Sequence, residues 1–106
     1  MSCRDEDESR AWFAALFGRT HDAAPMGGLA EWHLGSDAGF QLTLNPPNAG
    51  HGTLTVFVDD LNAERARLSE TVVSITEVEA GDAVDFMQLR DPDGNLVVLV
   101  RKRSGD

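Results

Sequence analysis

The histidines are the first candidates for catalysis or metal binding, because an imidazole acts as a general base or a metal ligand near neutral pH. The chain has three of them, His21, His33 and His51. Their spacing matches no metal-ligand motif, and His51 stands between two glycines, as is typical of an exposed turn residue. We therefore expect none of the three to bind a metal.

A cysteine nucleophile and an acid or base are the other catalytic candidates. Cys3 has no base near it in the sequence, and the carboxylates of residues 5–8 disfavour a thiolate, so we expect an inert thiol. The second half of the chain supplies three acids, Glu77, Glu79 and Asp85. Gln88 falls on the opposite strand face from Asp85, so at most one of the two faces inward. The sequence therefore assigns no catalytic residue.

Residues 91–95, with the sequence DPDGN, are candidates for a calcium loop or for a tight turn. A calcium loop of the EF-hand kind needs a glycine at its sixth position and a glutamate at its twelfth, and the twelfth position here is Lys102. Pro92 presets its own φ, and Gly94 accepts a positive φ. We predict a tight turn and no calcium site.

Charge and hydropathy exclude several classes of partner. Nine Lys and Arg stand against eighteen Asp and Glu in 106 residues, a net charge of −9. Three of the nine cations are residues 101–103, so no basic stripe is available for nucleic acid. There is no apolar run of about 18 residues for a membrane span, no signal-peptide pattern in residues 1–9, and only one cysteine. We expect one small, soluble, reduced, cytoplasmic domain without nucleic acid or membrane partners.

The first half of the chain predicts one helix and two strands. An apolar stripe predicts a helix over residues 9–17, with Ser9 as its N-cap and Gly18 as its stop. Apolar and polar residues then alternate over residues 29–34 and 40–44, which is typical of two neighbouring strands. The helix stripe that we expect in the core consists of Trp12, Phe13 and Phe17.

The second half repeats this order after a break at residues 45–50, which contain two prolines. Residues 53–58 predict a strand, and a helix follows over about residues 61–69, with Asp59 or Asp60 as its N-cap. Three further strands are predicted over residues 72–78, 83–90 and 95–101. The chain therefore reads as a structural duplication.

Four segments in this order resemble the vicinal oxygen chelate superfamily, which includes glyoxalase I, bleomycin-resistance proteins and extradiol dioxygenases. They are DEDESRAWFAALFG, GFQLTLN, LTVFVDDLNAERARL and LRDPDGNLVVLV, and the DPDGN hairpin is the most specific part. The resemblance implies a single α+β domain of two βαβββ modules, about residues 1–48 and 51–104. Their mixed sheets would curl around a cavity with the helices outside. It also implies a homodimer.

The first strand of this fold is curtailed or absent here. The resemblance places it ahead of Asp5, where only residues 1–4 remain. Either the chain begins downstream of its natural start, or a partner chain or loop covers the exposed sheet edge. The second case strengthens the expectation of a homodimer.

The resemblance also implies up to four metal-ligand positions, one on the first and one on the last strand of each module. The first position falls before Met1, and the other three correspond to Gln41, Thr53 and Val98. An amide, a hydroxyl and a hydrocarbon are a poor ligand set for a divalent ion. We therefore expect no metal and no other cofactor.

Strand alternation about these positions predicts which residues line the cavity enclosed by the curled sheets, called the cup below. The residues expected to face inward are Gln41, Thr43, Thr53, Thr55, Phe57, Leu96, Val98 and Val100. Trp32 is a further ligand-binding candidate, although its strand leaves open whether it faces the cup or the helix. The predicted cup is mostly apolar, with few hydrogen-bonding groups.

These residues favour a metal-free protein that binds a small organic molecule, in the manner of bleomycin-resistance proteins. The alternative is a metal-dependent lyase, isomerase or dioxygenase whose missing ligand comes from an N-terminal segment or a second subunit. A third interpretation is a structural module that pairs with a catalytic partner. The sequence leaves open the identity of the ligand and whether any reaction is catalysed.

Overall fold

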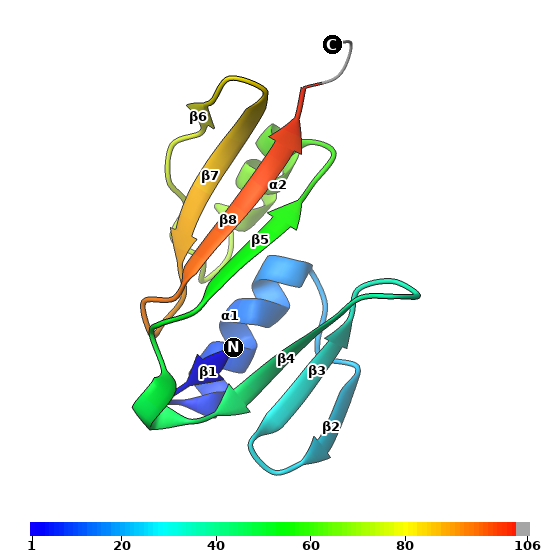
Figure 1. Ribbon diagram of the computed structural model, residues 1–106, viewed down its shortest axis with the longest axis vertical. Helices are drawn as coiled ribbons and strands as arrows, with labels where there is room; N and C mark the ends of the chain where they lie inside the picture. The colour runs from blue at the N-terminus through cyan, green and yellow to red at the C-terminus, as the bar shows by residue number, and fades with distance from the viewer. Residues whose placement is uncertain (104–106) are drawn as a thin grey trace.

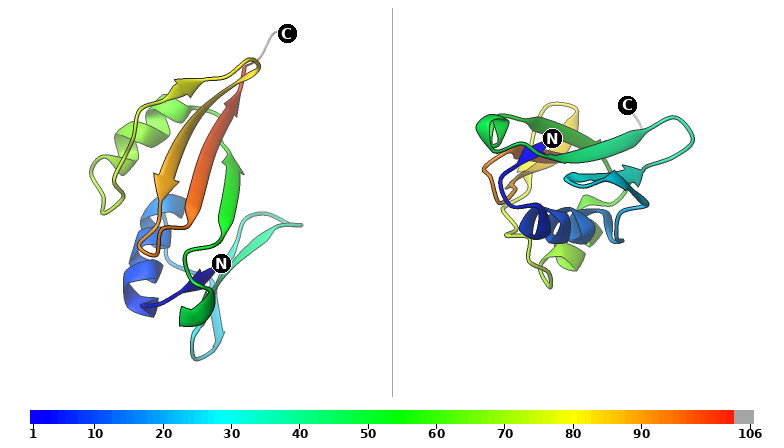
Figure 2. Two further views of the ribbon diagram at one scale, coloured as in Figure 1. Left: turned by 60° about the vertical axis from the view of Figure 1, so that its left-hand side comes forward. Right: turned by 90° about the horizontal axis from the view of Figure 1, so that it is seen from below.

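Two four-stranded sheets make up the protein, and each has one α-helix on the same side of the molecule (Figure 1, Figure 2). The computed structural model describes residues 1–103. The first half contains β1 (Ser2–Cys3), α1 (Glu6–Phe17), β2 (Ala23–Met26), β3 (Leu29–His33) and β4 (Gly39–Leu44). After the 3₁₀ helix η1 (Pro46–Asn48), the second half contains β5 (Thr53–Phe57), α2 (Leu61–Leu68), β6 (Glu79–Ala80), β7 (Val84–Arg90) and β8 (Leu96–Lys102). The predicted α+β fold of two βαβββ modules is confirmed.

The two sheets share one pairing scheme. Their strand orders are β1-β4-β3-β2 and β5-β8-β7-β6, and the first strand of each half runs parallel to the last. The parallel pair in the second sheet extends from Thr53, opposite Leu96, to Phe57, opposite Val100. In the first sheet it consists of only Ser2 and Cys3 against β4. The first strand is therefore curtailed, as predicted, and not absent.

Helix α1 begins earlier than the apolar pattern predicts. Its N-cap is Asp5, whose carboxylate accepts a hydrogen bond from the main-chain N–H of Glu8 at 3.1 Å. The prediction of Ser9 as the N-cap is wrong, since Ser9 is buried within the helix and its hydroxyl donates to Asp93 at 3.2 Å. The acidic first turn has no apolar periodicity, but it is stabilised by the positive end of the helix dipole. Gly18 ends the helix with a φ of 75°, as predicted.

Helix α2 has Asp60 as its N-cap, which selects between the two predicted caps. The Asp60 carboxylate accepts a hydrogen bond from the main-chain N–H of Ala63 at 3.0 Å. Leu61 and Leu68, one at each end of the helix, are buried. Neither α1 nor α2, the α-helices within residues 1–103, is long and apolar enough to cross a membrane.

Residues 72–78 do not form the predicted strand. Only Glu79–Ala80 pairs with β7, and it does so as the edge strand β6. Within the preceding loop, Val73 is buried in the core, and the Thr76 hydroxyl donates to the main-chain oxygen of Gln88 at 2.7 Å. Three of the apolar residues that suggested a strand, Val73, Ile75 and Val78, therefore cover the core from a loop, and the Thr76 side chain links this loop to the sheet.

Strand β2 has no counterpart among the predicted elements. Its sequence, Ala-Ala-Pro-Met, lacks the alternation of apolar and polar residues that indicates a strand. It lies at the edge of the first sheet and pairs with β3 in an irregular register. Pro25 is tolerated at such an edge, because one side of an edge strand makes no ladder hydrogen bonds.

Aromatic side chains fill the core between α1 and the first sheet. Trp32 has no exposed surface, and its ring centroid lies 5.7 Å from that of Phe17 and 6.0 Å from that of Phe40. Its indole nitrogen donates to the main-chain oxygen of Arg19 at 3.0 Å, so the polar atom of the ring is paired. Trp32 therefore faces the helix, and the aromatic stripe predicted for α1 lies in the same core.

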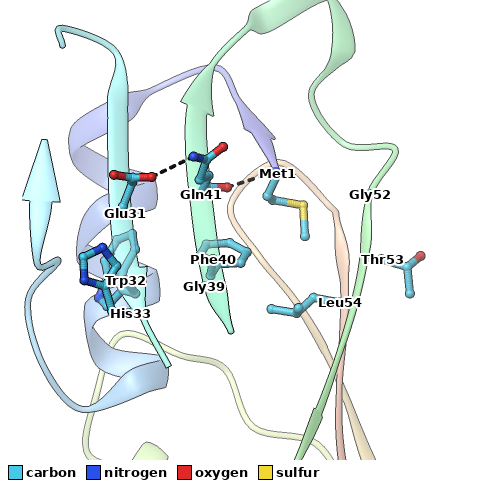
Figure 3. Close-up of a pocket in the computed structure, with 10 residues that line it drawn as sticks. All are labelled: Met1, Glu31, Trp32, His33, Gly39, Phe40, Gln41, Gly52, Thr53 and Leu54. Carbon is cyan, nitrogen blue, oxygen red and sulfur yellow. Dashed lines mark hydrogen bonds between the residues drawn. The ribbon is translucent and has the colours of Figure 1, made fainter. Parts of the chain in front are cut away.

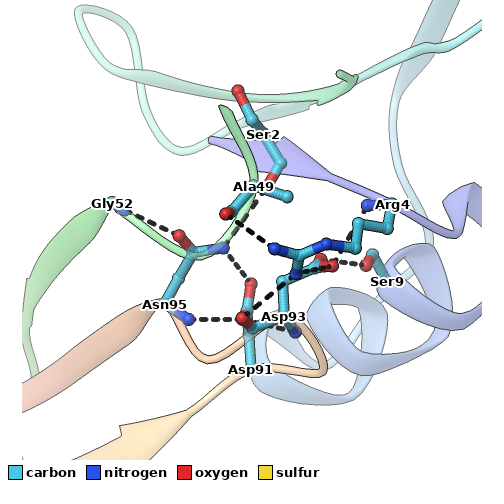
Figure 4. A network of polar contacts seen from close by, with 8 residues as sticks. All are labelled: Ser2, Arg4, Ser9, Ala49, Gly52, Asp91, Asp93 and Asn95. Carbon is cyan, nitrogen blue, oxygen red and sulfur yellow. Dashed lines mark hydrogen bonds and ion pairs between the residues drawn. The ribbon is translucent and has the colours of Figure 1, made fainter. Parts of the chain in front are cut away.

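The turn between β7 and β8 connects the two halves (Figure 4). Asp93 accepts a hydrogen bond from the main-chain N–H of Arg4 at 3.1 Å, and the side chain of Asn95 donates to the main-chain oxygen of Ser2 at 3.3 Å. The Asp91 carboxylate accepts from the main-chain N–H groups of Asp93 and Asn95 at 3.0 and 2.8 Å. The predicted tight turn is confirmed, and it also anchors the N-terminal segment.

Arg67 of α2 provides a second connection between the halves. Its guanidinium donates to the main-chain oxygens of Ala15 and Leu16, each at 2.7 Å, and forms an ion pair with Glu64 at 2.7 Å. The last carbonyl groups of a helix have no partner within the helix, so Arg67 satisfies two of them at the end of α1. The two helices are therefore joined by directed hydrogen bonds.

Candidate functional site

The sheet faces opposite the helices are open, and they carry most of the predicted site residues. Pairing of β5 with β8 sets six of these residues side by side: Thr53 with Leu96, Thr55 with Val98, and Phe57 with Val100. On β4, Gln41 and Thr43 are exposed, whereas the intervening Leu42 is buried. Trp32 lies on the other face of its sheet, so the structure separates it from the rest of the predicted set.

A pocket of about 490 Å³ lies between the two halves, where β3 and β4 face the start of β5 (Figure 3). The residues that line it are Met1, Glu31, Trp32, His33, Gly39, Phe40, Gln41, Gly52, Thr53 and Leu54. Gln41 and Thr53 are the predicted residues with exposed side chains here. The fully buried ring of Trp32 forms part of the layer behind the pocket. The predicted residues Thr43, Thr55, Phe57, Leu96, Val98 and Val100 are outside this lining.

Glu31 and His33 line the pocket but are absent from the predicted set. Their signal is the alternation along β3: because Trp32 faces the helix, both of its neighbours face the open side. The other histidines lie elsewhere. His21 packs edge-on against Trp32, with ring centroids 5.8 Å apart, and His51 is exposed and outside the lining.

Glu31 and Gln41 form the polar wall of the pocket. They are directly opposite each other on the antiparallel strands β3 and β4, and Gln41 Nε2 donates to Glu31 Oε2 at 2.7 Å. This bond orients the amide, because its nitrogen faces the carboxylate and its carbonyl oxygen is left as an acceptor. The wall therefore presents oxygen acceptors from both side chains.

The loop after α1 supports the end of β3 beside this wall. The Asp22 carboxylate accepts hydrogen bonds from the main-chain N–H of His33 and from the Arg19 guanidinium, both at 2.6 Å. The bond from His33 is the main cause that lowers the pKa of Asp22 below its ordinary value of 3.8, and Arg19 lowers it further. The position of His33 is therefore fixed through its main chain.

A second pocket of about 360 Å³ lies at the far ends of β5 and β8. Its lining consists of Phe57, Val58, Asp59, Arg101 and Lys102. The Lys102 ammonium lies 5.1 Å from the centroid of the Phe57 ring, which is 62% exposed. Phe57 therefore lies in a different pocket from Gln41 and Thr53. The remaining predicted residues of the sheet face, namely Thr43, Thr55, Leu96, Val98 and Val100, line neither of these two pockets.

The metal positions implied by the family resemblance do not form a suitable donor set. They hold the Gln41 amide, whose nitrogen is bonded to Glu31, the Thr53 hydroxyl and the Val98 hydrocarbon. Divalent ions in proteins are typically held by several carboxylate, imidazole or thiolate groups, and the lining of this pocket contains one carboxylate, Glu31, and one imidazole, His33. Within residues 1–103, no three His, Cys, Asp or Glu side chains are grouped so as to hold a metal ion.

The other catalytic candidates lie away from the pocket. Asp85 forms ion pairs with Arg101 and Arg103 at 3.5 and 3.1 Å. Cys3 has no exposed surface; burial raises the pKa of its thiol, and the nearby Asp93 carboxylate raises it further. A buried thiol with a raised pKa is a poor nucleophile, so the predicted inertness of Cys3 agrees with its environment.

Solved structures identify the fold. A glyoxalase/bleomycin resistance protein from Catenulispora acidiphila matches with a TM-score of 0.88 and 26% identity, over 97% of this chain and 94% of that one. The chain has the vicinal oxygen chelate fold. Lactoylglutathione lyase from Agrobacterium tumefaciens matches with a TM-score of 0.76 and 16% identity, over 95% of this chain and 88% of that one. The resemblance seen in the sequence is therefore confirmed.

The vicinal oxygen chelate fold serves more than one role among these matches. TnmS3, an antibiotic binding protein from Streptomyces sp. CB03234, matches with a TM-score of 0.76 and 21% identity, over 97% of this chain and 93% of that one. No family model and no curated protein matches the sequence. Because a lyase and a binding protein share the fold, the function of this chain has to be argued from its pocket residues.

Proposed function

We propose that this protein binds a small organic molecule in the pocket between its two halves and that it does so without a metal ion or a catalytic step. The observation that carries this proposal is the pocket lining. A pocket of about 490 Å³ suits a drug-sized ligand, and it combines the apolar side chains of Met1 and Leu54 with the polar wall of Glu31 and Gln41. TnmS3, named an antibiotic binding protein, provides a precedent for binding alone on this fold.

The chemistry of the pocket favours binding over catalysis. General acid–base catalysis in the absence of a metal needs a positioned proton donor or acceptor, and metal catalysis needs several strong ligands. The pocket offers one carboxylate, Glu31, which accepts a hydrogen bond from Gln41, and one exposed imidazole, His33, whose ring is not positioned by a hydrogen bond to any residue in 1–103. The alternative function, a metal-dependent lyase, isomerase or dioxygenase, requires ligands from an N-terminal segment or a second subunit.

We also infer a homodimer that acts in the cytoplasm. Support for the dimer comes from the open face of the second sheet, where Phe57 is 62% exposed and Leu96 and Val98 lie close by on the same face. β5 is the edge strand of the second sheet and has no strand partner on one side. A second copy covering this face would remove both apolar surface and open edge from water.

A dye titration tests the proposed function. Nile red is neutral, and its fluorescence rises in an apolar site, so we expect saturable 1:1 binding. Leu54 points from β5 toward β4 (Figure 3), so Leu54→Trp places a larger side chain in the pocket and is expected to raise the dissociation constant by about tenfold or more. Thr20→Trp, at an exposed position outside the lining, is the control and should change it less than about twofold. Equal affinities of the two variants and the unmodified protein would contradict binding in this pocket.

A further inference from the structure

The oxygen acceptors of Glu31 and Gln41 indicate the chemistry of the ligand. We infer that the ligand carries a cationic nitrogen donor of the amidinium, guanidinium or ammonium class, and that Glu31 selects this group. This inference rests on the binding function proposed above. Gln41 is the positioning residue, since it holds the carboxylate. The apolar part of the ligand then lies toward Leu54, which points into the pocket from its opposite side (Figure 3).

The hydrogen bond between the two side chains accounts for this preference. Gln41 uses its amide nitrogen to donate to Glu31 Oε2 at 2.7 Å. Among the residues that the structure describes, Glu31 Oε1 and Gln41 Oε1 have no hydrogen-bond partner. Two acceptors side by side match a ligand group with several N–H donors, and hydrogen bonds between charged groups are stronger than neutral ones.

The position of Glu31 in the sheet makes its carboxylate a fixed feature of the pocket. Glu31 lies in the middle of β3, a strand paired on both sides, and is only partly exposed. A partly buried carboxylate attracts a cation more strongly than one in free solution, because the surrounding protein has a lower dielectric constant than water. Since both partners are already in place, little ordering is required when the ligand binds.

Two other polar groups border the pocket and compete with this preference. The α-ammonium of Met1 donates to the main-chain oxygen of Gln41 at 3.0 Å, and the His33 imidazole is exposed at the other end of the lining. Met1 precedes β1, a strand of only two residues with one neighbouring strand, whereas Glu31 belongs to a strand with neighbours on both sides. We therefore assign the selection of the ligand's charged group to Glu31. An anionic probe tests the opposite case, in which Met1 or His33 selects an anion.

Three probes of one shape test the inference. 2-Naphthamidine, 2-naphthamide and 2-naphthoate share a ring system and carry a cationic, a neutral and an anionic group at the same position. Each is titrated into ¹⁵N-labelled protein while the amide resonances of β3, β4 and the start of β5 are followed. We expect 2-naphthamidine to bind with a dissociation constant about tenfold or more below those of the other two.

Variants show whether Glu31 is responsible. Glu31→Gln keeps the size of the side chain and removes its charge, so the dissociation constant of 2-naphthamidine should rise about tenfold, with that of 2-naphthamide within about twofold. Glu70→Gln removes the same charge from an exposed position outside the pocket and should leave all three constants within about twofold. The comparison of probes in the unmodified protein does not depend on the folding of either variant.

Several results would overturn the inference. Equal affinity for the three probes, tighter binding of 2-naphthoate, or an unchanged amidine affinity in Glu31→Gln would each exclude selection of a cation by Glu31. If none of the three probes binds, the inference is also wrong. In each case saturable binding of Nile red that is weakened in Leu54→Trp would leave the proposed function standing, so the two failures are distinguishable.

Discussion

The main-chain N–H of Gly52 donates a hydrogen bond of 2.7 Å to the side-chain oxygen of Asn95. This bond links the segment between η1 and β5 to the β7–β8 turn. Asn95 is buried, and its amide nitrogen donates to Asp91 at 2.7 Å and to the main-chain oxygen of Ser2 at 3.3 Å (Figure 4). The Asn95 side chain therefore connects β1, the segment between η1 and β5, and the β7–β8 turn. It also holds Gly52 and Thr53, which form one wall of the larger pocket.

Loss of the Asn95 side chain should destabilise the protein. Asn95→Ala leaves the Gly52 N–H and an Asp91 oxygen without this partner in a buried region, so we expect the free energy of unfolding to fall by about 2–3 kcal/mol. Urea denaturation measures it. Asn48→Ala, at an exposed position in η1, is the control and should change it by less than about 0.5 kcal/mol. Equal effects of the two variants would show that the Asn95 bonds contribute little.

Two glycines separate the effect of a backbone angle from that of a steric clash. Gly50 and Gly94 have φ values of 89° and 91°, so alanine is strained at either position. A Cβ at Gly50 would lie 2.7 Å from the main-chain oxygen of Asp93, whereas a Cβ at Gly94 has no heavy atom within 4 Å. We expect Gly50→Ala to lower the unfolding free energy by at least about 1 kcal/mol more than Gly94→Ala. A larger loss for Gly94→Ala in the same denaturation assay would contradict this close approach.

The lowered pKa of Asp22 predicts an acid-sensitive contact at the end of β3. A carboxyl whose pKa is lower in the folded state stabilises the fold above its ordinary value of 3.8, and this contribution is lost as pH falls through the lowered pKa. We expect the carboxyl carbon of Asp22 to titrate below 3.8 in an NMR experiment. Arg19→Gln should raise this midpoint only partly, because the His33 N–H bond is the larger cause. A midpoint at or above 3.8 in the unmodified protein would show that these bonds do not favour the charged form.

The inferred homodimer predicts a sensitive position on the open sheet face. Light scattering at micromolar concentration should give the mass of two chains. Phe57→Asp places a charge on this face and should give the mass of one chain. Val72→Asp, at a residue that is 67% exposed but lies in the loop after α2, should leave the dimer intact. A single-chain mass for the unmodified protein would exclude the dimer.

The elements that the sequence predicts well are those in which local pattern and burial agree. Residues 53–58 alternate, and β5 forms there with alternate side chains toward the core. The strand predicted over residues 72–78 does not form, because Val73, Ile75 and Val78 cover the core from a loop, which local pattern does not distinguish from a strand. The start of α1 fails because Asp5 is followed by an acidic turn without apolar periodicity, while Ser9 is used for a contact with the distant Asp93.

The candidate site depends on contacts that no local pattern contains. Alternation correctly places Gln41 and Thr53 on exposed strand positions, but the boundary of the pocket is set by how the two sheets are oriented to each other. Glu31 could be assigned to the pocket only once Trp32 was known to pack against α1. The separation of Phe57 from Gln41 and Thr53, which line a different pocket, likewise follows from tertiary structure.

Nile red titration before and after removal of metal ions by EDTA dialysis tests metal-free binding most directly. If the pocket binds an organic molecule through its own side chains, the dissociation constant should be the same within about twofold in both preparations. Loss of binding after dialysis, with recovery on addition of Zn²⁺ or Mn²⁺, would contradict the proposed function and would favour a metal-dependent protein.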